Sequence, residues 1–212
     1  MKLLSLISGG IDSPVAAHLM QNLGHEIIYV HFYNHTAAKE IVKDKVQRLV
    51  GQVSGPTAKL HIVPFEPIQR MLIGHVPAEY RMIVYRRVMF WIAEEMRKKE
   101  HAEGFITGDS IGQVASQTLT NLTTIHRAAA DIPIYAPLLG FDKEEIIKIA
   151  KEIGTYEISI LPYSDCCSFL IARHPATKAP RQKIEEIEQG LDREKLIQLA
   201  LSIPVQTSLL PE

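Results

Sequence analysis

Short apolar runs alternate with longer amphipathic segments along most of the chain. Runs of four to eight apolar residues between glycine or polar clusters are typical of buried strands, whereas apolar residues spaced three or four apart predict helices. The pattern predicts five strands, at 3–7, 25–32, 60–65, 104–108 and 134–138. It predicts helices at 14–23, 37–50, 67–73, 78–100, 112–122 and 143–153, followed by two short helices at 182–189 and 193–201.

The order of these elements predicts the fold class. Ser13, Thr36 and Asp142 are placed to cap three of the helices, because their side-chain oxygens can accept hydrogen bonds from the free N–H groups of a first turn. Alternating strands and helices imply an α/β protein with a doubly wound parallel sheet of about five strands and helices on both faces. We expect one domain over 1–180 and a C-terminal helical extension over 181–212 that packs on it.

Composition and charge narrow the class of protein. With 212 residues, 46% of them hydrophobic and 22% charged, the chain has the composition of an ordinary globular protein. A net charge of −1 excludes a domain-wide field for nucleic acid, so such binding needs a local patch or a partner chain. No apolar run approaches the length of a membrane span and no signal-peptide cleavage region follows Met1, so we expect a soluble, cytoplasmic protein.

The first strand leads into a glycine-rich turn that opens directly into a helix. Residues 8–13 read Ser-Gly-Gly-Ile-Asp-Ser, and Pro14 suits a first helical position. Gly9 and Gly10 let an anion approach the backbone, and the helix N-terminus favours phosphate there. The spacing differs from G-x-x-x-x-G-K-[ST] and from G-x-G-x-x-G. It resembles the pyrophosphate loop, SGGxDS, of enzymes that split ATP between the α- and β-phosphates.

Three strand ends are expected to meet at one crevice beside this loop, because ligands of doubly wound sheets bind beyond the carboxyl ends of the strands. The second strand ends at His31 and Phe32, which can hold a base, and the fourth runs into 107–110. His31 is equally well read as a core histidine. Asp12, a carboxylate inside an anion site, is placed to hold Mg²⁺ through the phosphates; the alternative is a helix-start aspartate stabilised by the helix dipole.

Three later segments carry further candidate chemistry. The uncharged stretch 110–122 either faces a ligand cavity or a subunit, or packs as a buried helix. Cys166 and Cys167 are adjacent in a loop, so they form no disulfide framework; they are either reactive thiols or small buried hydrophobes. A basic run follows, which either lowers a thiol pKa or contacts RNA, or is a solvated loop. The run contains Arg173, His174, Lys178, Arg181 and Lys183.

Several stretches together resemble the catalytic domain of the tRNA 4-thiouridine synthetases, the tRNA uridine-4 sulfurtransferases also tied to thiamine biosynthesis. The resemblance covers most of the chain, and GQVASQTL and PYSDCC are its most specific parts. The matching stretches are LISGGIDSPVA (6–16), HF (31–32), YRRVM (85–89), TGDSIGQVASQTLTNL (107–122), DKEEIIKIAKEIGTYEISILPYSDCC (142–167) and HPATKAPR (174–181).

The resemblance implies roles for individual residues. Asp12 matches the loop aspartate needed for activation, and Cys167 aligns better than Cys166 with the cysteine used in sulfur transfer. Of two adjacent arginines the resemblance favours Arg87 over Arg86 at ATP. The other implied ATP contacts are Leu6, Ile7, Ser8, Gly9, Gly10, Asp12, Ser13, His31, Phe32, Gly108 and Gln117.

The implied reaction uses ATP and Mg²⁺ to adenylate O4 of a tRNA uridine, after which a persulfide or thiolate sulfur displaces AMP. A sulfur donor such as a cysteine desulfurase would supply the sulfur. The loop begins at residue 8, so we expect no RNA-binding THUMP region in this chain, and no rhodanese-like domain. RNA capture then falls to a separate chain, a homodimer surface or weak contacts from Arg173, Lys178, Arg181 and Lys183. The alternatives are adenylation of another acceptor and a non-catalytic nucleotide-binding subunit.

Overall fold

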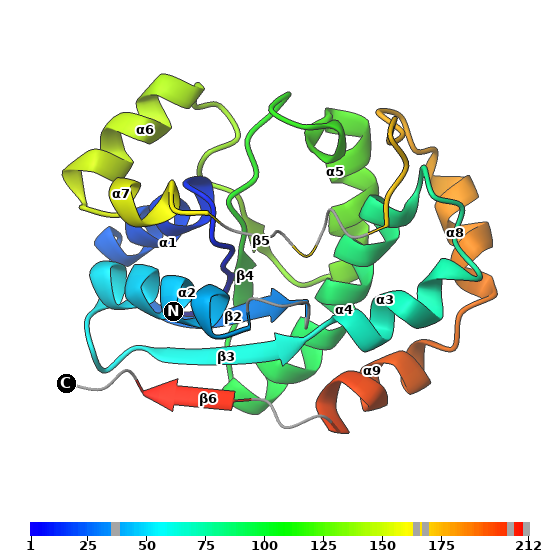
Figure 1. Cartoon of the computed structure of the whole chain (residues 1–212), viewed down its shortest axis with the longest axis horizontal. Helices are drawn as coiled ribbons and strands as arrows, with labels where there is room; N and C mark the ends of the chain where they lie inside the picture. Colours follow the sequence, from blue (N-terminus) through cyan, green and yellow to red (C-terminus); the bar gives the residue numbers. More distant parts are fainter. Residues whose placement is uncertain (35–38, 163–165, 167–169, 203–205, 210–212) are drawn as a thin grey trace.

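The computed structural model describes residues 1–34, 39–162, 166, 170–202 and 206–209, with 39–43 and 206–209 described as backbone only. Its sheet has the strand order β5-β4-β1-β2-β3-β6 (Figure 1). The first five strands are parallel, as predicted, and β6 is an antiparallel edge strand on β3 that the sequence pattern did not reveal. Their bounds are β1 Lys2–Leu6, β2 Glu26–Tyr33, β3 Lys59–Pro64, β4 Gly104–Ile106, β5 Ile134–Tyr135 and β6 Gln206–Leu209.

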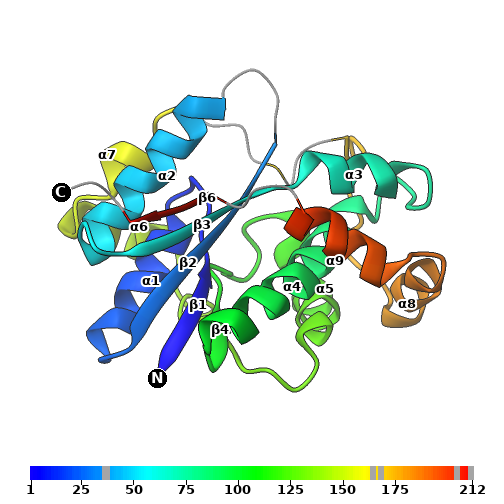
Figure 2. The same cartoon turned by 90° about the horizontal axis from the view of Figure 1, so that it is seen from below.

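Helices cover both faces of the sheet, which confirms the doubly wound arrangement. Figure 2 shows α1, α2, α6 and α7 on one face and α3, α4, α5, α8 and α9 on the other. The first group is α1 Asp12–Asn22, α2 Lys39–Ser54, α6 Lys143–Glu152 and α7 Tyr156–Ser159. The second group is α3 Glu66–Ile73, α4 Arg81–Glu100, α5 Leu119–His126, α8 Arg181–Gln189 and α9 Arg193–Ser202, with two 3₁₀ turns, η1 Ala115–Gln117 and η2 Arg127–Ala129.

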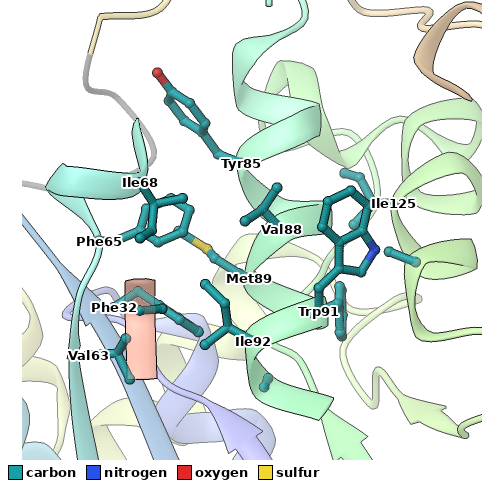
Figure 3. Close-up of a cluster of buried hydrophobic side chains, with 14 of the residues drawn as sticks. Phe32, Val63, Phe65, Ile68, Tyr85, Val88, Met89, Trp91, Ile92 and Ile125 are labelled. Carbon is teal, nitrogen blue, oxygen red and sulfur yellow. The ribbon is translucent and has the colours of Figure 1, made fainter. Parts of the chain in front are cut away.

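Helix α4 lies at the centre of the larger hydrophobic core (Figure 3). Its Tyr85 ring packs edge-on against Phe65, with 6.0 Å between ring centroids, and Phe65 packs in the same way on Phe32 at 5.5 Å. Such edge-to-face pairs add to the stabilisation that burial itself gives. The contacts fix α4 against the carboxyl ends of β2 and β3, which brings the N-terminal half of this helix to the crevice.

Two local predictions need correction. Helix α1 begins at Asp12, and Ser13 lies within its first turn, where its hydroxyl bonds Ser8 instead of capping the helix. The single helix predicted over 112–122 is a turn followed by η1 and α5, because Gly112 adopts φ +82° and the backbone at Thr118 is extended. The Thr118 side chain caps α5, and Asp142 forms the predicted cap of α6 as a full capping box. The cap assigned to Thr36 lies outside the described residues.

The C-terminal part is not purely helical. Helices α8 and α9 form close to the predicted positions, and α9 packs on α3, α4 and β3. The chain then returns to the sheet as β6, where Lys59 pairs with Leu209 and Ile62 with Gln206. The described residues 181–202 and 206–209 therefore contribute to the same core and sheet as the elements before them.

Candidate functional site

A cavity of about 280 Å³ lies at the carboxyl ends of β1, β2 and β4. Strand β1 pairs with β2 on one side and β4 on the other, so the cavity lies where the order of the parallel strands reverses, the usual ligand position in such sheets. The structure thus brings together the three strand ends that the sequence predicted to meet. The lining residues are Leu6, Ile7, Ser8, Gly10, Asp12, Ser13, His31, Phe32, Met82, Arg86, Met89, Thr107, Gly108, Asp109, Val114, Ser116, Gln117 and Cys166.

The glycine loop is closed by its two serines. The Ser13 hydroxyl accepts a hydrogen bond from the Ser8 N–H at 2.8 Å, and the Ser8 hydroxyl accepts one from the Gly10 N–H at 3.2 Å. Behind the loop, Gly108 lies so close to the start of α1 that a Cβ there would be 2.6 Å from the Ser13 nitrogen. Only glycine fits this approach, so Gly108 lets the end of β4 support the loop from the side.

Asp12 forms an ion pair that the sequence analysis missed. Lys143, the first residue of α6, donates from Nζ to the Asp12 Oδ1 atom at 2.6 Å. A lysine is unfavourable at a helix N-terminus, and the aspartate offsets this. Lys143 lies in the matching stretch 142–167, but its local pattern is that of an ordinary helix start, so the pairing with Asp12 was not predicted. The pair places a cation beside the glycine loop, where phosphates would add negative charge.

His31 is buried, as a core histidine would be, and it also lines the cavity, where a ligand contact would have to lie. Its side chain is 1% exposed. Its Nδ1 atom lies 2.8 Å from the Ile7 carbonyl oxygen and must carry the proton, because a carbonyl oxygen only accepts. In the neutral ring Nε2 is then a hydrogen-bond acceptor, which suits an amino group such as that of adenine.

Arg86, and not Arg87, reaches the cavity. Successive helical residues point about 100° apart, so the two arginines leave α4 in different directions. Arg87 is buried, donates from Nε and Nη2 to the Glu188 carboxylate of α8 at 2.5 and 2.7 Å, and also bonds the Thr124 carbonyl oxygen. It is absent from the cavity lining, so we correct the preference for Arg87 at ATP and assign the candidate contact to Arg86.

Arg86 belongs to a buried ionic group. Its Nη2 atom donates to both oxygens of Asp109, at 2.7 and 2.8 Å, and His126 Nε2 donates to Oδ2 of the same carboxylate at 3.0 Å. Burial by itself raises the pKa of Asp109, but the charge of Arg86 and the hydrogen bond from His126 outweigh it and hold that pKa well below its usual range. Asp109 therefore stays ionised and fixes the guanidinium at the cavity wall.

The turn between β4 and α5 supplies one side of the cavity. Ser116 and Gln117 line it, so this stretch faces a cavity, as one of the two sequence readings proposed. The Gln117 N–H donates to the Val114 carbonyl at 2.8 Å, and the Gly112 N–H donates to the Gln117 carbonyl at 2.9 Å. These bonds hold Gln117 at the cavity.

Cys166 also lines the cavity. It is 5% exposed, and its carbonyl accepts a hydrogen bond from the fully buried Gln69 at 2.7 Å. The preferred Cys167 lies outside the described residues. Burial alone is consistent with the reading of Cys166 as a small hydrophobe, but its position on the cavity wall supports the reactive one.

The basic run divides into two parts. Arg173, His174 and Lys178 are exposed on the irregular segment before α8. Arg181 and Lys183 are also exposed but pair with Glu185 and Glu186 of their own helix, at 2.5 and 3.5 Å. Their charge is partly balanced locally, which leaves the irregular segment as the better candidate contact for an anion.

A doubly wound parallel sheet with a cavity formed around an SGGIDS turn defines a protein of the pyrophosphate-loop class. Residues 1–197 match the family described as thiamine biosynthesis protein (ThiI), and the chain belongs to that family. It is 43% identical over 94% of its length to a probable tRNA sulfurtransferase of Thermus thermophilus, and 44% identical over 94% to one of Acetivibrio thermocellus. It spans about half the length of these curated relatives: 50% and 51%, respectively.

Solved structures agree with this assignment. A 4-thiouridine synthetase in complex with RNA and bound ATP superimposes with a TM-score of 0.88 at 40% identity, over 97% of this chain and 55% of that one. NMN synthetase from Francisella tularensis, 13% identical with a TM-score of 0.58 over 97% of this chain and 78% of that one, shares only the fold.

None of the helices in the described part of the chain is long and apolar enough to cross a membrane.

Proposed function

We propose that this chain carries out the ATP-dependent step of tRNA sulfur transfer, activating a uridine for 4-thiouridine formation. The observation that carries the proposal is one cavity lined by the glycine loop, Arg86 and Cys166. It combines an anion site, a fixed cation and a thiol-bearing residue within reach of one ligand. A relative of 40% identity is described with both RNA and ATP bound, and the curated relatives are named as probable tRNA sulfurtransferases.

Each part of the cavity has a role in this reaction. The free N–H groups at the start of α1 bind the phosphates of ATP, His31 and Phe32 hold the base, and Arg86 and Gln117 fix the nucleotide from the other side. The uridine O4 attacks the α-phosphorus and pyrophosphate leaves. A sulfur nucleophile then attacks C4, the C–O bond breaks and AMP leaves. The helix N-terminus stabilises the charge that develops on the pyrophosphate.

Magnesium fits this site through Asp12. The described residues contain no group of three or more His, Cys, Asp or Glu side chains that could hold a metal ion by themselves. Magnesium commonly takes one or two carboxylates together with substrate phosphates and water, and Asp12 at the phosphate loop offers that carboxylate. Bound there, the ion would offset charge on the departing pyrophosphate.

We assign the acceptor role to tRNA and the sulfur supply to a donor protein such as a cysteine desulfurase, with the reaction in the cytoplasm. Because the net charge of the chain is −1, its own hold on tRNA is weak and depends on the local basic segment. We expect tRNA binding by the chain to weaken steeply as salt rises. Capture by a second RNA-binding chain or within a homodimer would raise the affinity.

The decisive experiment incubates the chain with ATP, Mg²⁺, sulfide and unmodified tRNA, and measures AMP and thiolated nucleoside together. Both products are expected from the wild-type chain and neither from Asp12→Ala, since the ATP step precedes sulfur transfer. An Asp192→Ala variant, which removes the side-chain acceptor of the Lys195 N–H at the start of α9 and lies outside the cavity lining, controls for stability. AMP without thiolated nucleoside would indicate another acceptor, and full AMP yield from Asp12→Ala would refute the role of the loop.

A further inference from the structure

Exposed apolar side chains occur in the segment that supplies one side of the cavity. The turn that joins β4 to α5 exposes Ile111 at 46% and Val114 at 53%, and the first residue of α5, Leu119, is 66% exposed. Among the described residues that line the cavity, Val114 alone is exposed, so it marks the rim. Exposed apolar side chains close in sequence to a residue at the rim of a cavity are typical of a surface that contacts a ligand.

This turn is held rigidly in its exposed position. The hydrogen bonds within it, between Gln117 and Val114 and between Gly112 and Gln117, close the loop on itself. Asn121, which is fully buried, donates from Nδ2 to the Ala115 carbonyl at 2.7 Å. Turning the aliphatic side chains inward would therefore break hydrogen bonds that close the turn. Their exposure in this structure costs free energy in water.

The same buried asparagine joins the turn to the basic segment. Asn121 Nδ2 also donates to the Ala176 carbonyl at 2.9 Å, and its Oδ1 accepts from the Ala179 N–H at 2.8 Å. The Thr118 hydroxyl donates to the Thr177 carbonyl at 2.8 Å. Arg173 and Lys178 on that segment are exposed, and no acidic residue occurs between 170 and 184. The apolar rim and these cations are thus held in one rigid unit.

We propose that residues 111–119 form a platform for the acceptor nucleotide of an RNA. This proposal rests on the proposed function of the cavity. The aliphatic side chains contact the face of the pyrimidine, and the cations of 173–178 contact phosphates of the adjoining strand. A base inside an RNA helix cannot reach bound ATP, so it must be presented unstacked, and an apolar surface at the rim receives it. The adjacent cations favour RNA over a protein partner because they complement its backbone.

Photocrosslinking tests the platform directly. The probe is a tRNA that carries 4-thiouridine at the acceptor position, since that base crosslinks to what it touches under near-ultraviolet light. We expect the crosslinked peptide, identified by mass spectrometry of the full chain, to contain residues 111–119. Crosslinks confined to other segments, or a lack of crosslinks in a chain that thiolates tRNA, would overturn the platform. Failure of the wild-type chain to form AMP and thiolated nucleoside would instead overturn the proposed function.

Substitutions in the platform test its contribution to tRNA binding independently. Ile111→Ser combined with Leu119→Ser removes apolar contact outside the ATP-lining set, and we expect the Kd for tRNA to rise about fivefold and the Kd for ATP to stay within twofold. Leu23→Ser is the matched control, because Leu23 is 70% exposed at the far end of α1. An unchanged Kd for tRNA would overturn the proposal. So would a double variant that loses binding of a sulfur-donor protein and keeps its tRNA affinity, since the turn would then be a protein-docking surface.

Discussion

At the scale of single residues, two adjacent arginines illustrate how position on a helix decides function. Arg86 lines the cavity and is held by Asp109, whereas Arg87 joins α4 to α8 through Glu188. The sequence places both in one YRRVM stretch, and no local pattern separates them. The packing of α4 separates them, because the helix can turn only one of the two toward the crevice.

Substitutions of these two arginines should have opposite effects on ATP binding and on stability. Arg86→Lys keeps a cation beside buried Asp109 but loses the planar fork, so we expect the Kd for ATP to rise about tenfold with little change in unfolding free energy. Arg87→Met leaves Glu188 without its main partner and should lower the unfolding free energy by about 1–3 kcal/mol while ATP binding stays normal. Nucleotide titration and urea unfolding measure the two effects. If Arg87→Met instead weakens ATP binding in a fully folded chain, the assignment of Arg86 is wrong.

Gly108 gives a second prediction at this scale. A Cβ at this position would meet the Ser13 nitrogen at 2.6 Å and the Ser13 Cα at 2.7 Å, both backbone atoms that cannot rotate away. Gly108→Ala must push β4 away from the glycine loop, and we expect a loss of about 1–3 kcal/mol in unfolding free energy together with weaker ATP binding. Gly74→Ala is the control, since a Cβ there meets no atom within 4 Å. Equal behaviour of the two variants would contradict the close approach.

At the scale of elements, a buried ionic contact joins the middle of β3 to the end of α4. His61 Nε2 lies 2.8 Å from one oxygen of Glu100, and Lys59 Nζ lies 2.7 Å from the other. Burial lowers the pKa of His61, and the Glu100 carboxylate offsets only part of that effect. The histidine is therefore held neutral in the folded chain, donating its Nε2 proton to the carboxylate.

This contact predicts a pH dependence of stability. Because the pKa of His61 is lower in the folded chain than the 6.5 of a free side chain, the unfolded chain binds the proton more readily. The contribution of His61 to stability is complete above pH 6.5 and declines as the pH falls toward its folded pKa. His61→Gln keeps an N–H donor without a titrating group. Urea unfolding between pH 6.5 and 5 should show a shallower decline for this variant, by at most about 1.4 kcal/mol per pH unit.

A steeper decline in the variant than in the wild-type chain would reverse the sign of this argument. Comparing the two chains removes the contribution of the other histidines, because they titrate in both. Above pH 7 the difference between the chains should be constant, which provides the control within the same experiment.

The helices and strands also show which parts of the fold could be predicted from the sequence and which could not. The five parallel strands and the capped start of α6 follow from local pattern, and the structure confirms them. The helix predicted over 112–122 fails because Gly112 needs a positive φ and Thr118 begins a new helix, both of which depend on the loop closing on itself. Strand β6 pairs with β3, which lies far away in the sequence, and a local sequence pattern cannot predict a pairing between such distant segments.

At the scale of the whole molecule, the candidate site also has a part that could be predicted from the sequence and a part that could not. His31 and Phe32 lie among the last residues of β2, and the glycine loop and Gly108 follow β1 and β4, so sequence order alone placed them at one edge of the sheet. Lys143 and His126 come from helices whose approach depends on packing. They reach Asp12 and Asp109 over separations of 131 and 17 residues, respectively. The part of the site that lies at the strand ends was therefore predictable, and the charged residues that pair with it were not.

The last prediction concerns the edge of the sheet. Without β6, residues 59–62 of β3 would present unpaired N–H and C=O groups to a second molecule, and such edges promote aggregation. A chain shortened to end at Ser202 should lose about 2 kcal/mol of unfolding free energy and form larger species in light scattering. A chain that ends at Leu209 keeps β6 and is the control. Because the cavity lies at the carboxyl ends of β1, β2 and β4, the shortened chain should still bind ATP wherever it remains folded. If it stays monomeric with an unchanged unfolding curve, β6 contributes nothing to the stability of the sheet.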